Sequence, residues 1–364
     1  MTAGSVATDP VLDLDYRAHL PQRRDIGIGI VGAGAIVRLA HLPAYQLAGF
    51  RVSAITDINA EAAEAAAGDF GIPNVSSSAE DLINRSDVAI VDIAVPPAAQ
   101  VDIALAAMSA GKSVLCQKPL ALEVADAERI AETAVRTGTR VAVNQQLRWG
   151  QAIRSIKDLI RKGWLGEVTG GLFDVDVLSD WNMWPWIVGQ PRLDYTYHSI
   201  HYLDATRFLL GEPRGVMAHV SRFPGQAALG ESRTVTVLDY ADTCSVTILV
   251  DHNNRFDPRA VVRVQGTEGR ATATLGLNYD YPVGRPDTLS FASLTRYPGT
   301  VFEKTFKERW VPDSFIGPMA ELMASIEEER EPNTSARDNL GTLRLVDAAY
   351  RSAASGQRVS LAGS

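Results

Sequence analysis

The stretch DIGIGIVGAGAIV, residues 25–37, joins a short apolar run to two closely spaced glycines and a second apolar run. The first run predicts a buried strand, and Gly32 and Gly34 predict a tight turn that leads into a helix. Because these glycines carry no side chain, the backbone there can approach a pyrophosphate held at the helix N-terminus. Val37 takes the third position of the usual dinucleotide fingerprint, so a plain turn explains the stretch equally well at this point.

From residue 25 to about residue 147, short runs rich in Val, Ile and Ala alternate with Ala-rich stretches of helical spacing. Strand-like runs such as VAIVDIAV, residues 88–95, are apolar with little alternation, as expected when helices cover both faces of a sheet. The alternation of strand and helix predicts a doubly wound parallel sheet over residues 25–147.

The rhythm changes in residues 148–364, after a linking helix expected over residues 152–162. Several strand-like runs there alternate with period two, which predicts a mixed or antiparallel sheet with one covered face. Helical spacing returns near the end, and these last helices are expected to pack back on the earlier domains. Residues 1–24 are expected to form an extra arm that folds over the cofactor or a neighbouring subunit.

Composition narrows the class of protein. The chain has 364 residues, of which 46% are hydrophobic and 21% charged, so two globular domains are expected. A net charge of −8 argues against nucleic acid as a partner, because phosphates require clustered Lys and Arg. Cys116 and Cys244 are too few for a disulfide framework or a zinc site, so the sequence predicts no metal and a reducing, cytoplasmic location.

No membrane partner is expected, because no run of about 18 apolar residues occurs. Arg23 and Arg24 imitate a twin-arginine export signal, but cleavage after them would remove the first strand.

The next expected strand, RVSAITD, ends in Asp57, 23 residues after Gly34. A carboxylate there accepts hydrogen bonds from both ribose hydroxyls of NAD and repels the 2′-phosphate of NADP, so the sequence favours NAD. A solvated carboxylate or the N-cap of the following helix is the alternative. Further cofactor contacts are predicted for Ala35 and Ile36, which follow the turn, and for Pro96, where a strand ends at the expected ligand crevice.

Lys118 ends another expected strand, within GKSVLCQKPLAL at residues 111–122, and is followed by Pro119. The proline restricts the backbone, and a strand end of this kind points into the crevice. An ammonium group held there is suited to meet a substrate hydroxyl.

Several motifs now stand in a fixed order, namely Gly32-Ala33-Gly34, Pro96-Pro97, AGKSVLCQKPLAL, NQQLRW, IHYLDATRFLLGEP and VQGTEGR. In this order they resemble the glucose-fructose oxidoreductase and inositol dehydrogenase family, Gfo/Idh/MocA, from Ile26 to Leu361. The resemblance implies an N-terminal Rossmann domain and a C-terminal α/β domain with a large open, mainly antiparallel sheet. It also implies a homodimer or homotetramer formed through that sheet, and oxidation or reduction of a secondary alcohol on a sugar, cyclitol or related polyol.

The family's Glu-Lys-Pro motif reads Gln117-Lys118-Pro119 here, so the lysine is kept and the acid is lost. By resemblance, Gln117, Asn144 and Gln145 contact the cofactor near the nicotinamide, and Arg148 contacts the substrate. Capping of a strand and a helix is the alternative for the residues of NQQLRW.

The Leu-x-Gly-x-Pro tail of IHYLDATRFLLGEP identifies His201 as the family histidine and places Tyr197 where relatives carry Asp. His201 is then predicted to remove the hydroxyl proton, Lys118 to stabilise the developing alkoxide, and Tyr197 to donate to the same oxygen or relay from it. Tyr197, His201 and Asp204 are expected on one face of a helix that Asp204 caps or orients. His198 is either a substrate contact or a structural residue.

Three tryptophans, Trp181, Trp184 and Trp186, lie in the broken segment SDWNMWPWIVGQP. Their rings suit stacking on a sugar or an aromatic aglycone; the alternative is that they fill the core. Residues 171–191 hold no Arg or Lys, so a neutral substrate is expected.

The sequence therefore predicts an NAD-dependent oxidoreductase acting on a neutral sugar, cyclitol or glycoside. The alternatives are an oxidoreductase whose tightly bound NAD is recycled by a second sugar, and a catalytically silent NAD-binding regulator.

Overall fold

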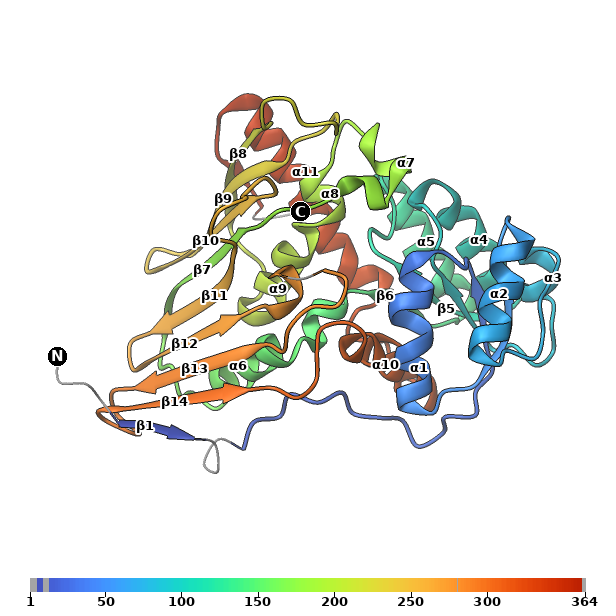
Figure 1. Ribbon diagram of the computed structural model, residues 1–364, viewed down its shortest axis with the longest axis horizontal. Helices are drawn as coiled ribbons and strands as arrows, with labels where there is room; N and C mark the ends of the chain where they lie inside the picture. The colour runs from blue at the N-terminus through green and yellow to red at the C-terminus, as the bar shows by residue number, and fades with distance from the viewer. Residues whose placement is uncertain (1–4, 9–12, 280, 362–364) are drawn as a thin grey trace. The chain divides into compact units, whose positions relative to one another are not determined.

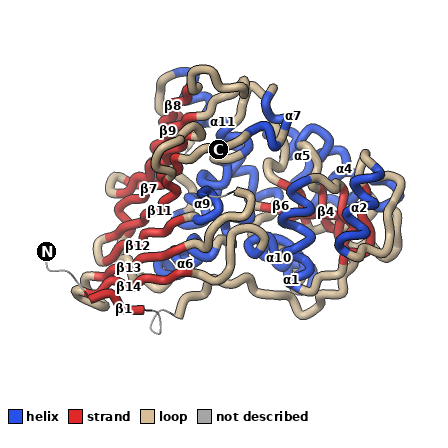
Figure 2. Tube along the Cα trace, in the orientation of Figure 1, coloured by secondary structure: helices blue, strands red, loops and turns tan. Residues whose placement is uncertain are grey.

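The computed structural model describes residues 5–8, 13–279 and 281–361, and these residues divide into two units. The parallel-sheet unit comprises Ala18–Gln146 and Val311–Leu343. The large-sheet unit comprises Leu147–Trp310 and the described residues of Met1–Arg17 and Arg344–Ser364. The strands, drawn red in Figure 2, form two sheets. The expected fold class is confirmed, because one sheet is wholly parallel and the other is mixed and mostly antiparallel.

The parallel sheet has the strand order β3-β2-β4-β5-β6. Its strands are β2 Ile28–Val31, β3 Val52–Thr56, β4 Ile90–Ile93, β5 Ser113–Gln117 and β6 Val141–Asn144. Every residue of β2, β4 and β6 is buried. Since successive side chains point to opposite faces, both faces of this sheet are covered, as the unbroken apolar runs predict.

Helices follow the strands of this unit in alternation (Figure 1). They are the π-helical segment η1 Val37–His41, α1 Leu42–Ala48, α2 Ala60–Phe70, α3 Ala79–Ile83, α4 Pro97–Ser109 and α5 Val124–Thr137. Two further helical segments of this unit, η5 Asp313–Phe315 and α10 Ile316–Glu327, come much later in the chain. The glycine turn leads directly into helical backbone at residue 35, as the sequence predicts.

Residues 311–343 return to the parallel-sheet unit, so the division differs from the single boundary expected at residue 147. Helix α10 contacts β5, β6 and α1 and buries Met319, Leu322 and Met323. The backbone N–H of Val143 also donates to the carbonyl of Thr334 at 2.8 Å. The expectation that the last helices pack back on the earlier domain is therefore confirmed for α10. The exact segment that returns was not predicted, because long-range packing leaves no local mark at a domain boundary.

The large sheet has ten strands in the order β1-β14-β13-β12-β11-β7-β10-β9-β8-β15. They are β1 Ser5–Thr8, β7 Val168–Asp176, β8 Gly215–Ser221, β9 Arg233–Ala241, β10 Cys244–Asp251, β11 Arg259–Gly266, β12 Gly269–Thr274, β13 Thr288–Ser293, β14 Thr300–Thr305 and β15 Val359–Ser360. Buried and exposed residues alternate along β9 and β10, so one face is covered and the other is open, as the period of two predicts.

The remaining helical segments are η2 Gln146–Trp149, α6 Gln151–Arg161, η3 Trp181–Met183, α7 Pro185–Val188, α8 Asp194–Tyr197, α9 Ile200–Leu210, η4 Gly276–Tyr279 and α11 Ala336–Ser355. Helix α6 contacts β12, β13 and α9, and α8 contacts β9. The ring of Tyr202 on α9 lies 5.9 Å from that of Phe173 on β7. These helices therefore supply the covering layer of the large sheet.

The N-terminal arm joins the sheet of its own chain. Strand β1 pairs in parallel with β14, and the ring of Tyr16 packs 5.0 Å from that of Phe306. The described part of the arm thus extends an open sheet edge, which uses backbone hydrogen-bonding groups that would otherwise be unpaired. The expectation that the arm covers the cofactor or a neighbouring subunit stays a prediction, and residues 1–4 and 9–12 lie outside the described ones.

Among residues 5–8, 13–279 and 281–361, no helix combines the length and the apolar character needed to cross a membrane.

Candidate active site

Glycine is present at the two positions of the first turn, 32 and 34, for different structural reasons. Gly32 has φ +113°, and a Cβ there would lie 2.5 Å from the carbonyl oxygen of Ala94, so the fold itself requires Gly32. A Cβ on Gly34 would meet no protein atom within 4 Å. Gly34 and Ala35 are exposed and Ile36 is partly exposed, at the start of helical backbone. This open surface suits a pyrophosphate, whose close approach a side chain at 34 would hinder.

Gly34→Ala is expected to weaken NAD binding by about tenfold or more while leaving the melting temperature almost unchanged. Gly32→Ala is the matched contrast, because its clash with Ala94 destabilises the fold whether or not NAD is present. Isothermal titration with NAD and thermal unfolding measure the two effects. Normal NAD affinity in a well-folded Gly34→Ala protein would contradict the placement of the pyrophosphate.

Asp57 is tied to the same turn. Its Oδ2 accepts the backbone N–H of Ala33 at 2.6 Å, and its Oδ1 accepts that of Asn59 at 2.8 Å. The N-cap of α2 is Asn59, whose side chain accepts from Ala62, so the N-cap alternative for Asp57 is wrong. The carboxylate is thus held beside the glycine turn, and its contact with the ribose hydroxyls stays a prediction.

The second strand end is organised by α4. Pro96 is the N-cap residue of this helix, as expected where a strand stops. One turn later the buried Gln100 donates from Nε2 to the carbonyls of Gln117, Pro119 and Leu120, at 2.8, 3.0 and 3.0 Å. Gln100 therefore holds the backbone on both sides of Lys118. This role of Gln100 was missed from the sequence.

Lys118 follows the last residue of β5 and is partly buried. Burial lowers the pKa of its ammonium group to about 8. The neighbouring Gln117 accepts the backbone N–H of Lys118 with its Oε1 at 2.8 Å. A neutral amide thus stands where the related motif has an acid, and Lys118 exchanges its proton closer to neutral pH than an ordinary lysine does.

A buried histidine, His41, organises the polar groups around this strand end. Its Nδ1 lies 2.7 Å from Oδ2 of Asp92, which also accepts the hydroxyl of Tyr45 at 2.7 Å. The opposite nitrogen, Nε2, lies 3.2 Å from the side-chain nitrogens of both Gln117 and Asn144. An Nδ1–H donating to Asp92 leaves Nε2 as the acceptor for the two amides, which orients Gln117 with its oxygen toward Lys118.

The strand ends of the parallel-sheet unit therefore bring Gln117, Lys118 and Asn144 together. Gln145 is also buried, and its backbone N–H donates to the carbonyl of Val143 at 2.7 Å. His41 and Asp92 were missed from the sequence. A carboxylate inside the apolar run VAIVDIAV was the available signal, because a buried charge needs a partner.

In the large-sheet unit, the single helix expected to carry Tyr197, His201 and Asp204 is in fact two. Helix α8 ends at Tyr197, the backbone of His198 leaves helical geometry with φ −123° and ψ −62°, and α9 begins at Ile200. The expectation that the three residues share a helix face is wrong for this reason. Side-chain and backbone hydrogen bonds from Ser199 to Asp194 stabilise the break.

The two predicted catalytic residues of this unit have different surroundings. His201 is 6% exposed on the first turn of α9, with its ring 5.7 Å from that of Trp310. Tyr197 is buried in a small apolar cluster with Ile187, Leu193 and Ala228. Burial raises the pKa of the Tyr197 hydroxyl, so this group donates hydrogen bonds and does not act as a base near neutral pH.

Asp204 was expected to cap or orient the helix, and the capping role is wrong. It lies within α9 and accepts two hydrogen bonds from Arg148, from Nε and Nη2, both at 2.7 Å. Both side chains are buried. Removing one partner of such a pair typically costs about 3–5 kcal/mol. Arg148 therefore has a structural task, and its predicted contact with substrate stays a prediction.

Each tryptophan of the loop packs against one aromatic or histidine ring. Trp181 lies 4.7 Å from His252, Trp184 lies 5.6 Å from Tyr281, and Trp186 lies 5.4 Å from Tyr197. Trp181 and Trp184 also pack on the apolar cluster around Tyr197, whereas Trp186 is 41% exposed. The loop is thus part core and part surface, and stacking on a substrate stays a prediction.

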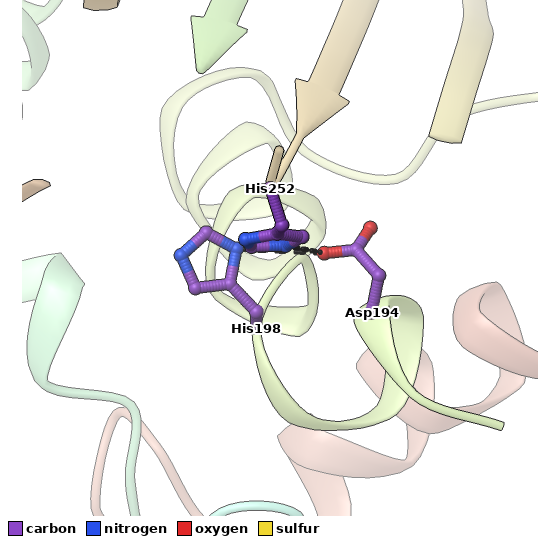
Figure 3. Close-up of side chains that lie close together, drawn as sticks. All are labelled: Asp194, His198 and His252. Carbon is purple, nitrogen blue, oxygen red and sulfur yellow. Dashed lines mark hydrogen bonds and ion pairs between the residues drawn. The ribbon is translucent and has the colours of Figure 1, made fainter. Parts of the chain in front are cut away.

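A polar cluster missed from the sequence lies beside this loop. Asp194, His198 and His252 converge from α8, the turn after it and the end of β10 (Figure 3). Burial alone would raise the pKa of Asp194, but its interactions with His198 and His252 outweigh burial and hold the pKa well below its usual range. The four-residue spacing of Asp194 and His198 was visible in the sequence, whereas His252 carried no local signal.

Two family profiles match the chain. One is described as an oxidoreductase family with an NAD-binding Rossmann fold and matches residues 26–145, and the other as an oxidoreductase family C-terminal α/β domain and matches residues 157–361. They cover both units described above.

Individual relatives agree with the profiles. A D-apiose dehydrogenase from Paraburkholderia graminis is 29% identical over 340 residues, covering 91% of this chain and 88% of the relative. An inositol 2-dehydrogenase from Salmonella paratyphi B is 31% identical over 192 residues, covering 51% of this chain and 54% of the relative. The solved structure of an oxidoreductase from Agrobacterium radiobacter, with NAD⁺, L-tartaric acid and magnesium, has a TM-score of 0.81 at 23% identity, covering 92% of this chain and 98% of its own. This last likeness shows the fold.

Proposed function

Because the chain belongs to the GFO/IDH/MocA oxidoreductase family and carries its NAD-binding Rossmann fold, we propose that it interconverts a secondary alcohol and a ketone on a neutral sugar, cyclitol or glycoside. The observation that carries the proposal is Lys118, held at the end of β5 with its pKa lowered to about 8. The open turn at Gly34 and the carboxylate of Asp57 support NAD as the partner of this lysine.

The chemistry assigns one task to each residue. When bound, NAD supplies the acceptor for the hydride that leaves the alcohol carbon. Lys118 donates a hydrogen bond to the alcohol oxygen and stabilises the alkoxide that develops there. His201 accepts the hydroxyl proton, so the alcohol loses a hydride and a proton in all and becomes a ketone. Tyr197 donates a hydrogen bond to the same oxygen.

A neutral polyol is the substrate class that the surroundings favour. The relatives named above act, by their names, on D-apiose and on inositol, which are uncharged polyhydroxyl compounds. The loop of Trp181, Trp184 and Trp186 offers ring faces suited to the C–H face of such a molecule. We place the substrate against this loop.

The test is to incubate the protein with NAD and a panel of pentoses, cyclitols and aromatic glycosides and to follow NADH formation by absorbance. We expect turnover with at least one neutral polyol and none with its phosphate ester. Bound NADH that copurifies and is consumed by a ketose would favour a tightly held nucleotide recycled by a second sugar. NAD binding without turnover across the panel would favour a regulatory protein and would count against the proposal.

We also propose that the open face of the large sheet pairs with a second copy of the chain. Val235 and Val237 on β9 are 43% and 36% exposed, and Met217 on β8 and Leu249 on β10 are 53% and 36% exposed. In the sheet register Val237 lies opposite Met217, and Val235 lies opposite Leu249. A contiguous apolar patch of this kind is typical of an interface.

Val237→Lys is expected to convert the oligomer into monomers without a change in far-UV circular dichroism, because a desolvated ammonium group opposes association. Light scattering after gel filtration measures the mass. Thr247→Lys, which lies opposite Val237 at the same face, should act in the same direction. A wild-type protein that is already monomeric at micromolar concentration would contradict the proposal.

A further inference from the structure

Three potential metal ligands meet inside the large-sheet unit. One ligand atom from each of Asp194, His198 and His252 lies within 4.8 Å of the other two (Figure 3). The side chains of Asp194 and His252 are fully buried, and that of His198 is 21% exposed. The cluster is therefore enclosed by protein with one partly accessible side, at His198.

Neighbouring hydroxyl groups hold two of these ligands in place. Ser179 Oγ lies 2.8 Å from Nδ1 of His252, so the other ring nitrogen, Nε2, points at Asp194. Ser199 and Thr234 donate to Oδ2 of Asp194 at 2.5 and 2.7 Å, which leaves Oδ1 for the histidines. Hydrogen bonds of this kind, behind a ligating imidazole and a ligating carboxylate, orient the ligands of metal sites.

The charge of the cluster also calls for a cation. With both imidazoles neutral, Asp194 would place an uncompensated negative charge in a fully buried position, which is costly. Either an extra proton on an imidazole or a metal ion removes this cost.

We propose that Asp194, His198 and His252 bind a divalent first-row transition metal ion of the Zn²⁺ type. Two imidazole nitrogens and one carboxylate oxygen suit Zn²⁺ or Co²⁺, whereas Mg²⁺ and Ca²⁺ prefer oxygen ligands alone. Three protein ligands leave a fourth position open, on the partly accessible side, for water or a hydroxyl group. This site does not depend on the proposed dehydrogenase reaction.

Binding requires only a small adjustment of the ligands. Asp194 Oδ1 now lies 2.7 Å from His252 Nε2 and 3.5 Å from His198 Nδ1. Ligand atoms about 2.0–2.1 Å from a tetrahedral ion are about 3.3 Å apart. The shorter contact therefore opens by about half an ångström as the ion replaces the proton that now joins the two groups.

The experiment uses the full chain without a histidine tag, stripped with a chelator and dialysed. Zn²⁺ and Co²⁺ are titrated by calorimetry, and bound metal is counted by elemental mass spectrometry. We expect one ion per chain at micromolar or tighter affinity, and a visible absorption band for the Co²⁺ form. Since the Trp181 ring lies 4.7 Å from that of His252, Co²⁺ should also quench tryptophan fluorescence, and Trp181→Phe should reduce the quenching without changing the stoichiometry.

Variants separate this site from adventitious binding. His252→Ala and His198→Ala should each weaken Zn²⁺ binding by more than about 100-fold, and Ser179→Ala by about 10- to 100-fold. His219→Ala, at an exposed position on β8, is the matched control and should bind as the wild type does. Should His252→Ala fail to fold, His198→Ala carries the test. No Zn²⁺ uptake at about 0.1 mM, or equal loss in His219→Ala, would overturn the proposal.

Discussion

Replacing Lys118 with Met is expected to lower kcat for polyol oxidation by about 10²- to 10³-fold while NAD still binds. The methionine keeps the length of the side chain but cannot donate a hydrogen bond to the developing alkoxide. Gln100 and Gln117 form hydrogen bonds to the backbone on both sides of Lys118. The ammonium group is therefore held in a fixed position, and its loss should have a large effect. Steady-state kinetics and NAD titration measure the two quantities.

Lys307→Met, at an exposed position, is the matched control and should leave kcat unchanged. A Lys118→Met protein with normal kcat and normal melting temperature would show that Lys118 takes no part in the reaction.

The pH dependence of the wild type gives the same residue a second test. The protonated form of Lys118 stabilises the alkoxide, and its pKa is lowered to about 8 by burial, so kcat should fall as pH rises through about 8. Gln117→Glu would add a negative charge at the residue next to Lys118, which favours the charged form of the ammonium group. In that variant the fall of kcat at alkaline pH should occur at a higher pH than in the wild type. A fall at a lower pH would contradict this role.

His201→Asn is expected to lower kcat by about 10²-fold or more with little change in NAD affinity. Asparagine keeps a polar side chain but cannot accept the hydroxyl proton at neutral pH. The groups proposed to hold NAD, the turn at Gly34 and the carboxylate of Asp57, do not include His201, so cofactor affinity should change little. Rapid-mixing kinetics with a saturating substrate separates the chemical step from product release.

His219→Asn, on the exposed side of β8, serves as the control for this substitution. Loss of the ring contact with Trp310 can also lower stability, so the melting temperature is measured in parallel. A well-folded His201→Asn protein with a kcat within about twofold of the wild type would show that another group is the base.

Several features of the site follow from sequence patterns that act locally. Three such features are the strand before Gly32, the turn at Gly34 and the strand end at Lys118. Each depends on the backbone preferences and apolar pattern of a few neighbouring residues, which a short stretch of sequence shows. The same holds for the alternation that separates the parallel sheet from the large one. The order of the sequence motifs by itself indicates the family.

Other features depend on partners far apart in the chain. His41 contacts Asp92, Gln117 and Asn144, which come from three different strands, and these meet only because β4, β5 and β6 are adjacent.

The helix break after Tyr197 shows why tertiary contacts override a local pattern. The sequence predicts one helix through Tyr197, His201 and Asp204. However, the Asp194 carboxylate contacts Thr234 on β9 and His252 at the end of β10, and Ser199 also donates to it. A buried carboxylate must be satisfied, and its partners exist only once the large sheet has formed. The sequence alone therefore determined the two sheets, the nucleotide turn and the family, because these follow from local backbone preference and apolar pattern. The tertiary structure decided which polar groups surround Lys118, and it brought Asp194, His198 and His252 into one cluster. Those contacts exist only when distant strands pair.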